Sequence, residues 1–360
     1  MKAFFYVQHL LGIGHLRRAA TIAQALRQAG FEVTLASGGA PVEGIAVLQL
    51  PPAASDASFR TLLDENGRPL DEAWKERRRA MLLRAVADFS PDVLIVELFP
   101  FGRRQMRFEL VPLLEQAAAR LVVCSVRDIL QPKPGREEEA LGHFERYFDR
   151  LLVHGDPRIA PFERSFALAH RLAGKLHYTG YVAQEPAAAG DAGAGEVLVS
   201  AGGGAVGRRL LETAIRARAL SGLRSRTWRI LAGVNAKQVE SLRVDGVIVE
   251  QARSDFVQRL RNCVVSVSQA GYNTVVETLQ AGARSVLVPF AGGGESEQTL
   301  RARLLSERGL VSMVEEEALS PATLAAAVDR AAAAPPAAAG AVDLGGARRS
   351  AELLREWLAC

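Results

Sequence analysis

The chain has 360 residues, more than one hydrophobic core usually supports, so we expect two domains. Its hydrophobic fraction of 49% and charged fraction of 23% are ordinary for a globular protein in water. The formal net charge of +4 is too small to indicate a nucleic-acid-binding protein. The basic residues occur in short scattered groups, which we interpret as solvated helix faces, with weak attraction to an anionic membrane or ligand as the alternative: Arg17-Arg18, Arg77-Arg78-Arg79, Arg103-Arg104, Arg208-Arg209 and Arg348-Arg349.

The few cysteines and the N-terminal residues indicate a compartment. Cys124, Cys263 and Cys360 do not have the spacing of metal ligands, and a reducing environment fits this pattern. The N-terminus leads directly into a strand without the features of a signal peptide, and no apolar run reaches the ~20 residues of a membrane helix. We therefore expect a cytoplasmic protein and leave open a peripheral contact with the inner face of the membrane.

Residues 1–36 have the pattern of a β-loop-α-β unit. An apolar run at residues 2–7 predicts a buried strand, a helical pattern begins at Leu16, and residues 31–36 predict a second strand. The loop before the helix contains His9, Gly12, Gly14 and His15. Its glycines let the backbone approach a ligand, and the helix N-terminus favours negative charge. Because no third glycine follows, we set a dinucleotide-binding fingerprint aside.

Polar residues recur where the later strands of this half are predicted to end. The strand at residues 91–97 ends at Glu97, the strand at 121–126 is followed by Arg127 and Asp128, and the strand at 151–153 is followed by His154. The carboxyl ends of parallel strands lie at one edge of a sheet, where ligands bind. We therefore expect these side chains to line a cleft.

A segment rich in Ala, Gly and Pro separates the two halves and is typical of a linker. We predict an N-terminal domain at residues 1–180, a linker at 181–195, a C-terminal domain at 196–340, and a final helix at 341–360 that returns to the N-terminal domain. The second half begins with a strand at 196–200, a loop with Gly202, Gly203 and Gly204, and a helix from residue 208. A later helix at 254–261 has Ser254 as its expected N-cap.

Residues 266–303 combine strand, turn, helix, strand, loop and helix, which is the repeating unit of a parallel sheet. The first strand turns at Gly271, the helix carries Glu277, and the second helix begins near Glu297 and Gln298. Both polar groups fall near the carboxyl ends of strands, where ligands gather. The chain as a whole predicts the α/β class, with two Rossmann-like domains built on parallel sheets.

Three stretches are specific enough to compare with known proteins: GIGHLRRAATIAQALRQAGFEV, VLVSAGGGAVG, and SQAGYNTVVETLQAGARSVLVPF with the following ESEQTLRA. Together they resemble glycosyltransferases of the GT-B class, of the MurG-like type with a family 28 C-terminal domain. The resemblance covers both halves and is strongest in the C-terminal one. It implies the GT-B architecture, with two sheets facing across a cleft. The residues around Glu97 and Arg127 differ from the MurG-like pattern, which indicates a separate bacterial branch.

By this resemblance the C-terminal domain binds a nucleotide-sugar donor, a UDP-sugar. Glu277 would accept hydrogen bonds from the ribose hydroxyls, and Glu297 with Gln298 would contact the donor sugar. The diphosphate would face the glycine-rich loop and the turn after Gly271. The donor-binding residues that the resemblance implies are Gly202, Gly203, Gly204, Arg253, Gly271, Asn273, Thr274, Glu277, Glu297, Gln298 and Arg301.

His15 matches the histidine of the family's GxGH motif and is the implied catalytic residue. At a helix N-terminus its imidazole would be neutral and would accept a proton from the acceptor hydroxyl. The acceptor-side candidates are His9, Gly12, Gly14, Glu97, Arg127, Asp128 and His154. The acceptor itself (lipid-linked, glycan or small molecule) stays open.

The resulting prediction is an enzyme that moves a hexose or an N-acetylhexosamine from a nucleotide diphosphate to a hydroxyl acceptor in the interdomain cleft. We expect no metal, no other cofactor and no nucleic-acid partner. Two alternatives stay open, a nucleotide-sugar 2-epimerase and a non-catalytic nucleotide-sugar-binding protein. Incubation with the donor alone distinguishes an epimerase from a transferase, because an epimerase changes the donor sugar without an acceptor. The donor sugar, the base, the stereochemical outcome and the oligomeric state are also left open.

Overall fold

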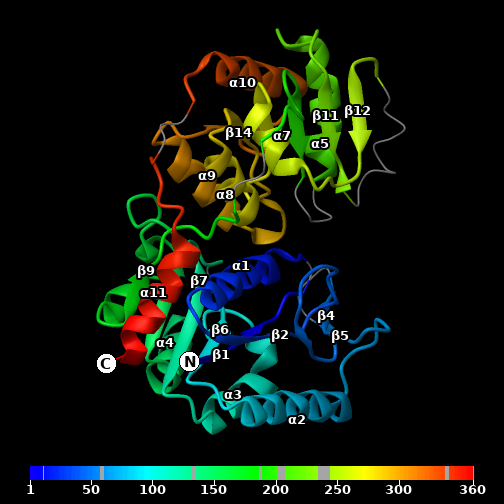
Figure 1. The fold of residues 1–360 in the computed structure, drawn as a ribbon. Coiled ribbons are helices and arrows are strands. Elements are labelled where there is room, and N and C mark those ends of the chain that lie inside the picture. Colours follow the sequence, from blue (N-terminus) through cyan, green and yellow to red (C-terminus); the bar gives the residue numbers. More distant parts are fainter. Residues whose placement is uncertain are drawn as a thin grey trace. The chain divides into compact units, whose positions relative to one another are not determined.

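The computed structural model describes residues 1–10, 12–56, 61–131, 134–185, 189–201, 207–233, 244–336 and 340–359. Contacts within the chain divide it into two compact units. Unit 1 comprises Met1–Val182 and Gly345–Cys360, and unit 2 comprises Ala183–Leu344. Each unit is a sheet with helices packed on its two faces (Figure 1).

Unit 1 is built on a seven-stranded parallel sheet of order β3-β2-β1-β6-β7-β8-β9. β4 (Ala54–Ser55) and β5 (Leu62–Leu63) form a separate antiparallel pair. Alternate residues of β1 belong to different core clusters: Phe4 and Tyr6 lie in one, and Phe5 and Val7 lie in the other. This alternation is expected for a strand of a sheet that is buried on both faces. The strands of the large sheet are β1 (Lys2–Val7), β2 (Glu32–Ser37), β3 (Leu48–Gln49), β6 (Val93–Glu97), β7 (Leu121–Arg127), β8 (Arg150–His154) and β9 (Leu176–Tyr178).

Helices cover both faces of this sheet. One face carries α1 (Gly14–Gln28) and α11 (Gly346–Ala359), and the other carries α2 (Glu72–Phe89), α3 (Arg107–Gln116) and α4 (Glu137–Tyr147). Leu354 and Leu358 of α11 share a core cluster with Leu16 and Ile22 of α1, so the C-terminal helix completes the core of unit 1. Short 3₁₀ turns follow two of the strands: η1 (Arg104–Met106) comes after β6, and η2 (Phe162–Arg164) and η3 (Ala169–Leu172) come after β8.

Unit 2 has a six-stranded parallel sheet of order β12-β11-β10-β13-β14-β15. The strands are β10 (Val197–Ser200), β11 (Trp228–Leu231), β12 (Val247–Glu250), β13 (Val265–Ser268), β14 (Ser285–Leu287) and β15 (Ser312–Met313). Its described helices are α5 (Arg208–Ala217), α7 (Phe256–Asn262), α8 (Tyr272–Ala281), α9 (Glu297–Ser306) and α10 (Pro321–Ala333), with the 3₁₀ turns η4 (Arg218–Leu220) and η7 (Gly292–Gly294). α5 and α10 pack on one face, and α7 packs on the other.

The direction of strand order reverses once in each sheet. In unit 1 the reversal lies between β1 and β6, and in unit 2 it lies between β10 and β13. Ligands of open α/β sheets bind outside the carboxyl ends of the strands at such switch points. The predicted class, α/β with two Rossmann-like parallel sheets, is confirmed, and the two switch points are where a site should be sought.

Two local details differ from the expectations. Tyr181 and Val182, assigned to the linker, are buried, and Val182 pairs with Gly345 inside unit 1. Ser254 does not cap a helix, because α7 begins two residues later, after Asp255. The carboxylate of Asp255 accepts hydrogen bonds from arginine side chains instead of capping the helix.

Candidate functional site

The switch point of unit 1 brings the loop after β1 next to the end of β6. These strands pair in parallel, with Tyr6 opposite Val96. The chain after β1 passes through residues 8–13 into α1, and β6 ends at Glu97. The first helical residues, Gly14 and His15, therefore start at the sheet edge where Glu97 lies.

His15 and Glu97 form a hydrogen-bonded pair at this edge. Nδ1 of His15 lies 2.7 Å from Oε1 of Glu97, and the two side chains are 17% and 1% exposed. Burial, the largest effect, lowers the pKa of His15 to about 3, although Glu97 opposes the shift. Burial alone would raise the pKa of Glu97, but contacts with His15 and the charges of Arg18 and Arg103 lower it to about 2.

This pairing determines which ring nitrogen of His15 carries the proton. An ionised carboxylate only accepts hydrogen bonds, so Nδ1 of the neutral ring donates to Glu97. Nε2 is then unprotonated, and its lone pair is available to accept a proton. A neutral histidine oriented by a carboxylate has the properties of a general base for a hydroxyl group.

Arg18 contacts the same carboxylate oxygen of Glu97 as His15 does. Its Nη2 donates to Oε1 of Glu97 at 2.5 Å, and the Arg18 side chain is 3% exposed. Arg18 lies three residues after His15 in α1, so both side chains extend from one side of the helix. The interpretation of Arg18 as part of a solvated face is therefore wrong. The spacing from His15 was the available signal for its role.

Arg78 of α2 is a second arginine that is not on a solvated face. It is fully buried and forms an ion pair of 2.7 Å with Glu109 of α3, which is also fully buried. The same guanidinium donates to Tyr6 and Gln8 at the end of β1, and to the backbone oxygens of Gly38 and Pro51. Arg78 thus fixes the start of the loop that leads to His15.

His154, an acceptor-side candidate at the end of β8, is fully buried. Its Nε2 lies 2.8 Å from Oγ of Ser125, and its Nδ1 lies 2.9 Å from Oγ1 of Thr179. Burial, with a smaller contribution from Arg18, lowers the pKa of His154 to about 3. Because both ring nitrogens are occupied inside the core, His154 joins β7, β8 and the chain after β9 and does not offer a surface to a substrate.

The other acceptor-side candidates differ in accessibility. Asp128 is fully buried, and its Oδ1 accepts a hydrogen bond from the backbone of Ile129 at 2.9 Å. Arg127 is partly buried at the end of β7, and Gly12 is exposed in the loop before α1. An added Cβ at Gly12 would meet no atom of the described chain within 4 Å. The backbone at Gly12 therefore has space beside it for a ligand.

His9 is 3% exposed and is the second residue after β1. Its ring packs against Gly39, where an added Cβ would come within 2.3 Å of a ring atom. Burial lowers its pKa, and the nearby Ala40 backbone opposes the shift. Within the described residues neither ring nitrogen reaches a partner with hydrogen-bond geometry. His9 is thus a neutral ring below the surface of this edge.

In unit 2 the switch point lies at the end of β13 and the start of α8. Gly271 precedes α8 without a side-chain cap among the described residues, and the N-terminus of a helix favours an anion. Asn273 and Thr274 lie in the first turn, and Glu277 follows one turn later, all partly buried. The candidates Gly202, Gly203 and Gly204, in the loop after β10, lie outside the described residues.

Gln298 at the start of α9 joins two strand ends. Its Oε1 accepts hydrogen bonds from the backbone nitrogen atoms of Ala270, at 3.1 Å, and Phe290, at 3.2 Å. These residues follow β13 and β14 respectively. Both bonds use the carbonyl oxygen, which leaves the amide nitrogen of Gln298 available to donate.

Glu297 and Arg301 form a buried ion pair next to Gln298 in α9. Nη2 of Arg301 lies 2.7 Å from Oε1 of Glu297, with side chains 1% and 3% exposed. Nη1 of Arg301 donates to the backbone oxygen of Ala270 at 2.9 Å, and its guanidinium lies over the ring of Tyr272. The pair fixes the turn between β13 and α8 from inside. Of the predicted sugar-contacting residues, Gln298 is therefore the more accessible, and Glu297 supports the turn.

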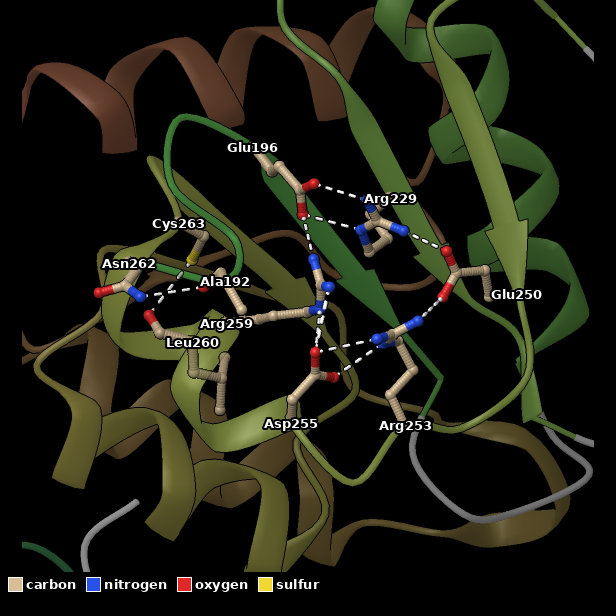
Figure 2. A network of polar contacts seen from close by, with 10 residues as sticks. All are labelled: Ala192, Glu196, Arg229, Glu250, Arg253, Asp255, Arg259, Leu260, Asn262 and Cys263. Atoms are coloured by element: carbon tan, nitrogen blue, oxygen red, sulfur yellow. Dashed lines mark hydrogen bonds and ion pairs between the residues drawn. The ribbon is translucent and has the colours of Figure 1, made fainter. Parts of the chain in front are cut away.

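Arg253 lies after the end of β12 and is held by acidic residues (Figure 2). Its Nε donates to Oδ1 of Asp255 at 2.7 Å, and its Nη1 donates to Oε2 of Glu250 at 2.9 Å. The hydrogen bonds with Arg253 lower the pKa of Asp255. The network continues through Arg229, Glu196 and Arg259. Arg253 thus has a fixed position at the strand end where the resemblance expects the nucleobase.

The described residues show neither a metal-binding cluster nor a helix that could span a membrane. No group of three or more His, Cys, Asp or Glu side chains in that part of the chain is arranged to hold a metal ion. Within the same residues, none of the helices combines the length and the apolar character that crossing a bilayer requires.

Comparison with known proteins agrees with the fold and gives the class of the C-terminal domain. The fold defined by the two switched parallel sheets is the GT-B fold of glycosyltransferases. Residues 230–343 match the glycosyltransferase family 28 C-terminal domain. The whole chain is similar to the solved structure of MurG from Acinetobacter baumannii, with a TM-score of 0.64, 15% identity, and coverage of 99% of this chain and 100% of that one.

Two further similar proteins are a curated relative and a solved structure. Over 141 residues the chain is 32% identical to the UDP-N-acetylglucosamine--N-acetylmuramyl-(pentapeptide) pyrophosphoryl-undecaprenol N-acetylglucosamine transferase of Ralstonia nicotianae. That match covers 36% of this chain and 38% of the relative, so it spans less than two fifths of the relative's length. The glycosyltransferase VinC, solved in complex with dTDP, has a TM-score of 0.63 at 17% identity, with 100% of this chain and 96% of that one covered. The predicted MurG-like GT-B fold is confirmed.

Proposed function

We propose that the protein is a glycosyltransferase that moves a hexose or an N-acetylhexosamine from a nucleotide diphosphate to a hydroxyl group of an acceptor. The observation that carries this proposal is the His15–Glu97 pair at the switch point of unit 1. It occurs in a chain whose residues 230–343 match a glycosyltransferase domain. Such a transfer needs a base that deprotonates the acceptor hydroxyl and a domain that binds the nucleotide sugar.

In the proposed reaction Nε2 of His15 accepts the proton of the acceptor hydroxyl while the oxygen bonds to the anomeric carbon of the donor sugar. The bond between that carbon and the diphosphate oxygen breaks, and its electron pair leaves with the nucleotide diphosphate. The imidazolium that forms is stabilised by the ionised Glu97 at 2.7 Å. The negative charge on the leaving group is stabilised by the N-terminus of α8, where the helix dipole favours an anion.

For the donor we propose a UDP-sugar bound by unit 2. Glu277, one turn into α8, accepts hydrogen bonds from the ribose hydroxyls, and the amide nitrogen of Gln298 donates to the sugar. The Ralstonia relative is named for UDP-N-acetylglucosamine, whereas VinC was solved with dTDP. The base is therefore the first property to test.

The environment of the enzyme also belongs to this proposal. A cytoplasmic location, peripheral contact with the inner membrane face, and catalysis without a metal stay predictions. The acceptor is an alcohol of lipid-linked, glycan or small-molecule type.

The test is a transfer assay with UDP-sugars and dTDP-sugars, each with and without a panel of sugar and lipid-linked alcohols. We expect release of nucleotide diphosphate and a new glycoside by mass spectrometry, both dependent on an alcohol acceptor. Epimerised nucleotide sugar in the absence of any acceptor would instead identify a 2-epimerase. Binding of the donor without turnover over the whole panel would identify a non-catalytic binding protein.

A further inference from the structure

Arg103 occupies an unusual position in the turn after β6. The turn is anchored in the core by Phe99 and Phe101, which are 1% and 7% exposed. Arg103 follows in the left-handed region with φ of +57°, a conformation that non-glycine residues adopt rarely. A partly buried arginine is thus held rigidly at the carboxyl edge of the unit 1 sheet, beside the site of His15.

The contacts of Arg103 do not neutralise its charge. Its Nε donates to the backbone oxygen of Gln8 at 2.8 Å. Among the described residues it has no carboxylate within ion-pair distance, whereas the buried Arg18 and Arg78 are paired with Glu97 and Glu109. The bond from Nε leaves the two terminal amino groups of the Arg103 fork for another partner.

The surroundings of Arg103 carry an excess of positive charge. Burial and the charges of Arg127 and Arg18 lower the pKa of Arg103, whereas Glu97 and Tyr6 oppose this shift. Glu97 is already engaged by Arg18 and His15. Removing an unpaired cation from water costs several kcal/mol unless an anion compensates it. The arrangement therefore favours a ligand that brings a negative charge.

We propose that Arg103 binds an anionic group of the acceptor, a phosphate or a carboxylate, close to the hydroxyl that His15 deprotonates. The inference rests on the proposed function and specifies its substrate class: the acceptor is an acidic alcohol. The guanidinium fork suits both anions because each presents two oxygens to parallel N–H donors. Assignment to the acceptor follows from location, since Arg103 and His15 both lie at the edge of unit 1 and the donor is assigned to unit 2.

The experiment uses the full chain as wild type and as the variants Arg103→Asn, Arg103→Lys and Arg104→Asn. Asparagine tolerates the left-handed conformation better than most residues and removes the charge. Arg104 is the matched control, because it is adjacent and exposed, with a single ion pair to Glu139 of 3.5 Å. The thermal unfolding midpoint is measured first with UDP and dTDP, and then with methyl phosphate, acetate or uncharged methanol at constant ionic strength. These titrations are made with and without the saturating nucleotide.

We expect methyl phosphate, acetate or both to raise the midpoint of the nucleotide-saturated wild type and of Arg104→Asn, because a ligand of the native state stabilises it. The dissociation constant of that anion should rise about tenfold or more in Arg103→Asn, as for loss of a charged hydrogen bond, and less in Arg103→Lys. The anion that binds decides between a phosphate and a carboxylate.

Equal responses of Arg103→Asn and Arg104→Asn to both anions, or no response of the wild type, would overturn the proposal. Loss of the anion effect once nucleotide is bound would also overturn it, because Arg103 would then serve the donor. Absence of any nucleotide effect would count against the proposed function, while the titrations without nucleotide would still report on Arg103.

Discussion

His15 can act as a base only because of the residues that surround it. Glu97 accepts the hydrogen bond from Nδ1–H, and Arg18 keeps Glu97 ionised and in place. With a pKa of about 3, His15 is neutral at every pH at which the protein would be assayed. Its role depends on orientation and tautomer more than on titration.

Replacement of His15 by alanine should abolish most of the turnover and leave donor binding unchanged. A positioned base contributes about 10² to 10⁴ in rate, so we expect a loss of kcat in that range. Steady-state kinetics with the acceptor found in the panel would measure the loss, and calorimetry would measure the donor affinity. Glu97→Gln keeps a hydrogen-bond acceptor beside Nδ1, so its loss of kcat should be smaller than that of His15→Ala. A His15→Ala enzyme with normal turnover would remove His15 from the reaction.

His154 should make the stability of unit 1 depend on pH. Its pKa is about 3 in the folded state, against about 6.5 in an unfolded chain, so the unfolded chain binds the proton first as the pH falls. The stabilisation is present above about pH 6.5 and is lost as the pH falls towards 3. The stability difference between wild type and His154→Gln should shrink by about 1 kcal/mol per pH unit below pH 6. Urea unfolding of both proteins at pH 7, 6 and 5 measures this difference in the free energy of unfolding. A difference that stays the same at all three pH values would contradict the buried, neutral state of His154.

The residue types at the site could be predicted from the sequence, but their pairing could not. The GxGH motif indicated His15, and the position of Glu97 at a strand end indicated that it faces a ligand. No local pattern indicates that residues 82 positions apart share a hydrogen bond. The buried arginines were interpreted as surface residues, because their partners Glu97 and Glu109 belong to other elements.

Among the elements, the strands were the most predictable, since their apolar runs are short and end in glycine or polar residues. Helix starts were less predictable where side chains had other partners, as at Asp255 before α7. The bridge from Gln298 to the backbone nitrogen atoms of Ala270 and Phe290 could not be predicted. It depends on three segments that meet only after the sheet has formed.

α11 should contribute strongly to the stability of unit 1 because it covers α1. Leu354 is fully buried in the cluster that contains Leu16 and Ile22. Leu354→Ala should lower the free energy of unfolding by about 2 to 5 kcal/mol, through lost burial and a residual cavity. Chemical denaturation would measure the loss, with the exposed Arg355→Ala in the same helix as control. Equal stability of the two variants would show that α11 is not part of the core.

At the scale of the whole molecule, the chain repeats one design twice. Each unit places a strand-to-helix turn at its switch point, His15 at the start of α1 in unit 1 and Gly271 before α8 in unit 2. The alternation of strands and helices made this design predictable. In the proposed function the two turns have different tasks: the turn of unit 1 removes a proton, and the turn of unit 2 binds the nucleotide.

The most direct test of this division is calorimetric titration of UDP and dTDP into the wild type, Glu277→Ala, His15→Ala and the control Glu307→Ala, which changes an exposed carboxylate of unit 2. We predict that one nucleotide binds the wild type, His15→Ala and Glu307→Ala equally. In Glu277→Ala the affinity should fall about tenfold or more, as expected for lost hydrogen bonds to a carboxylate. Failure of both nucleotides to bind, or equal binding by Glu277→Ala and Glu307→Ala, would contradict the account.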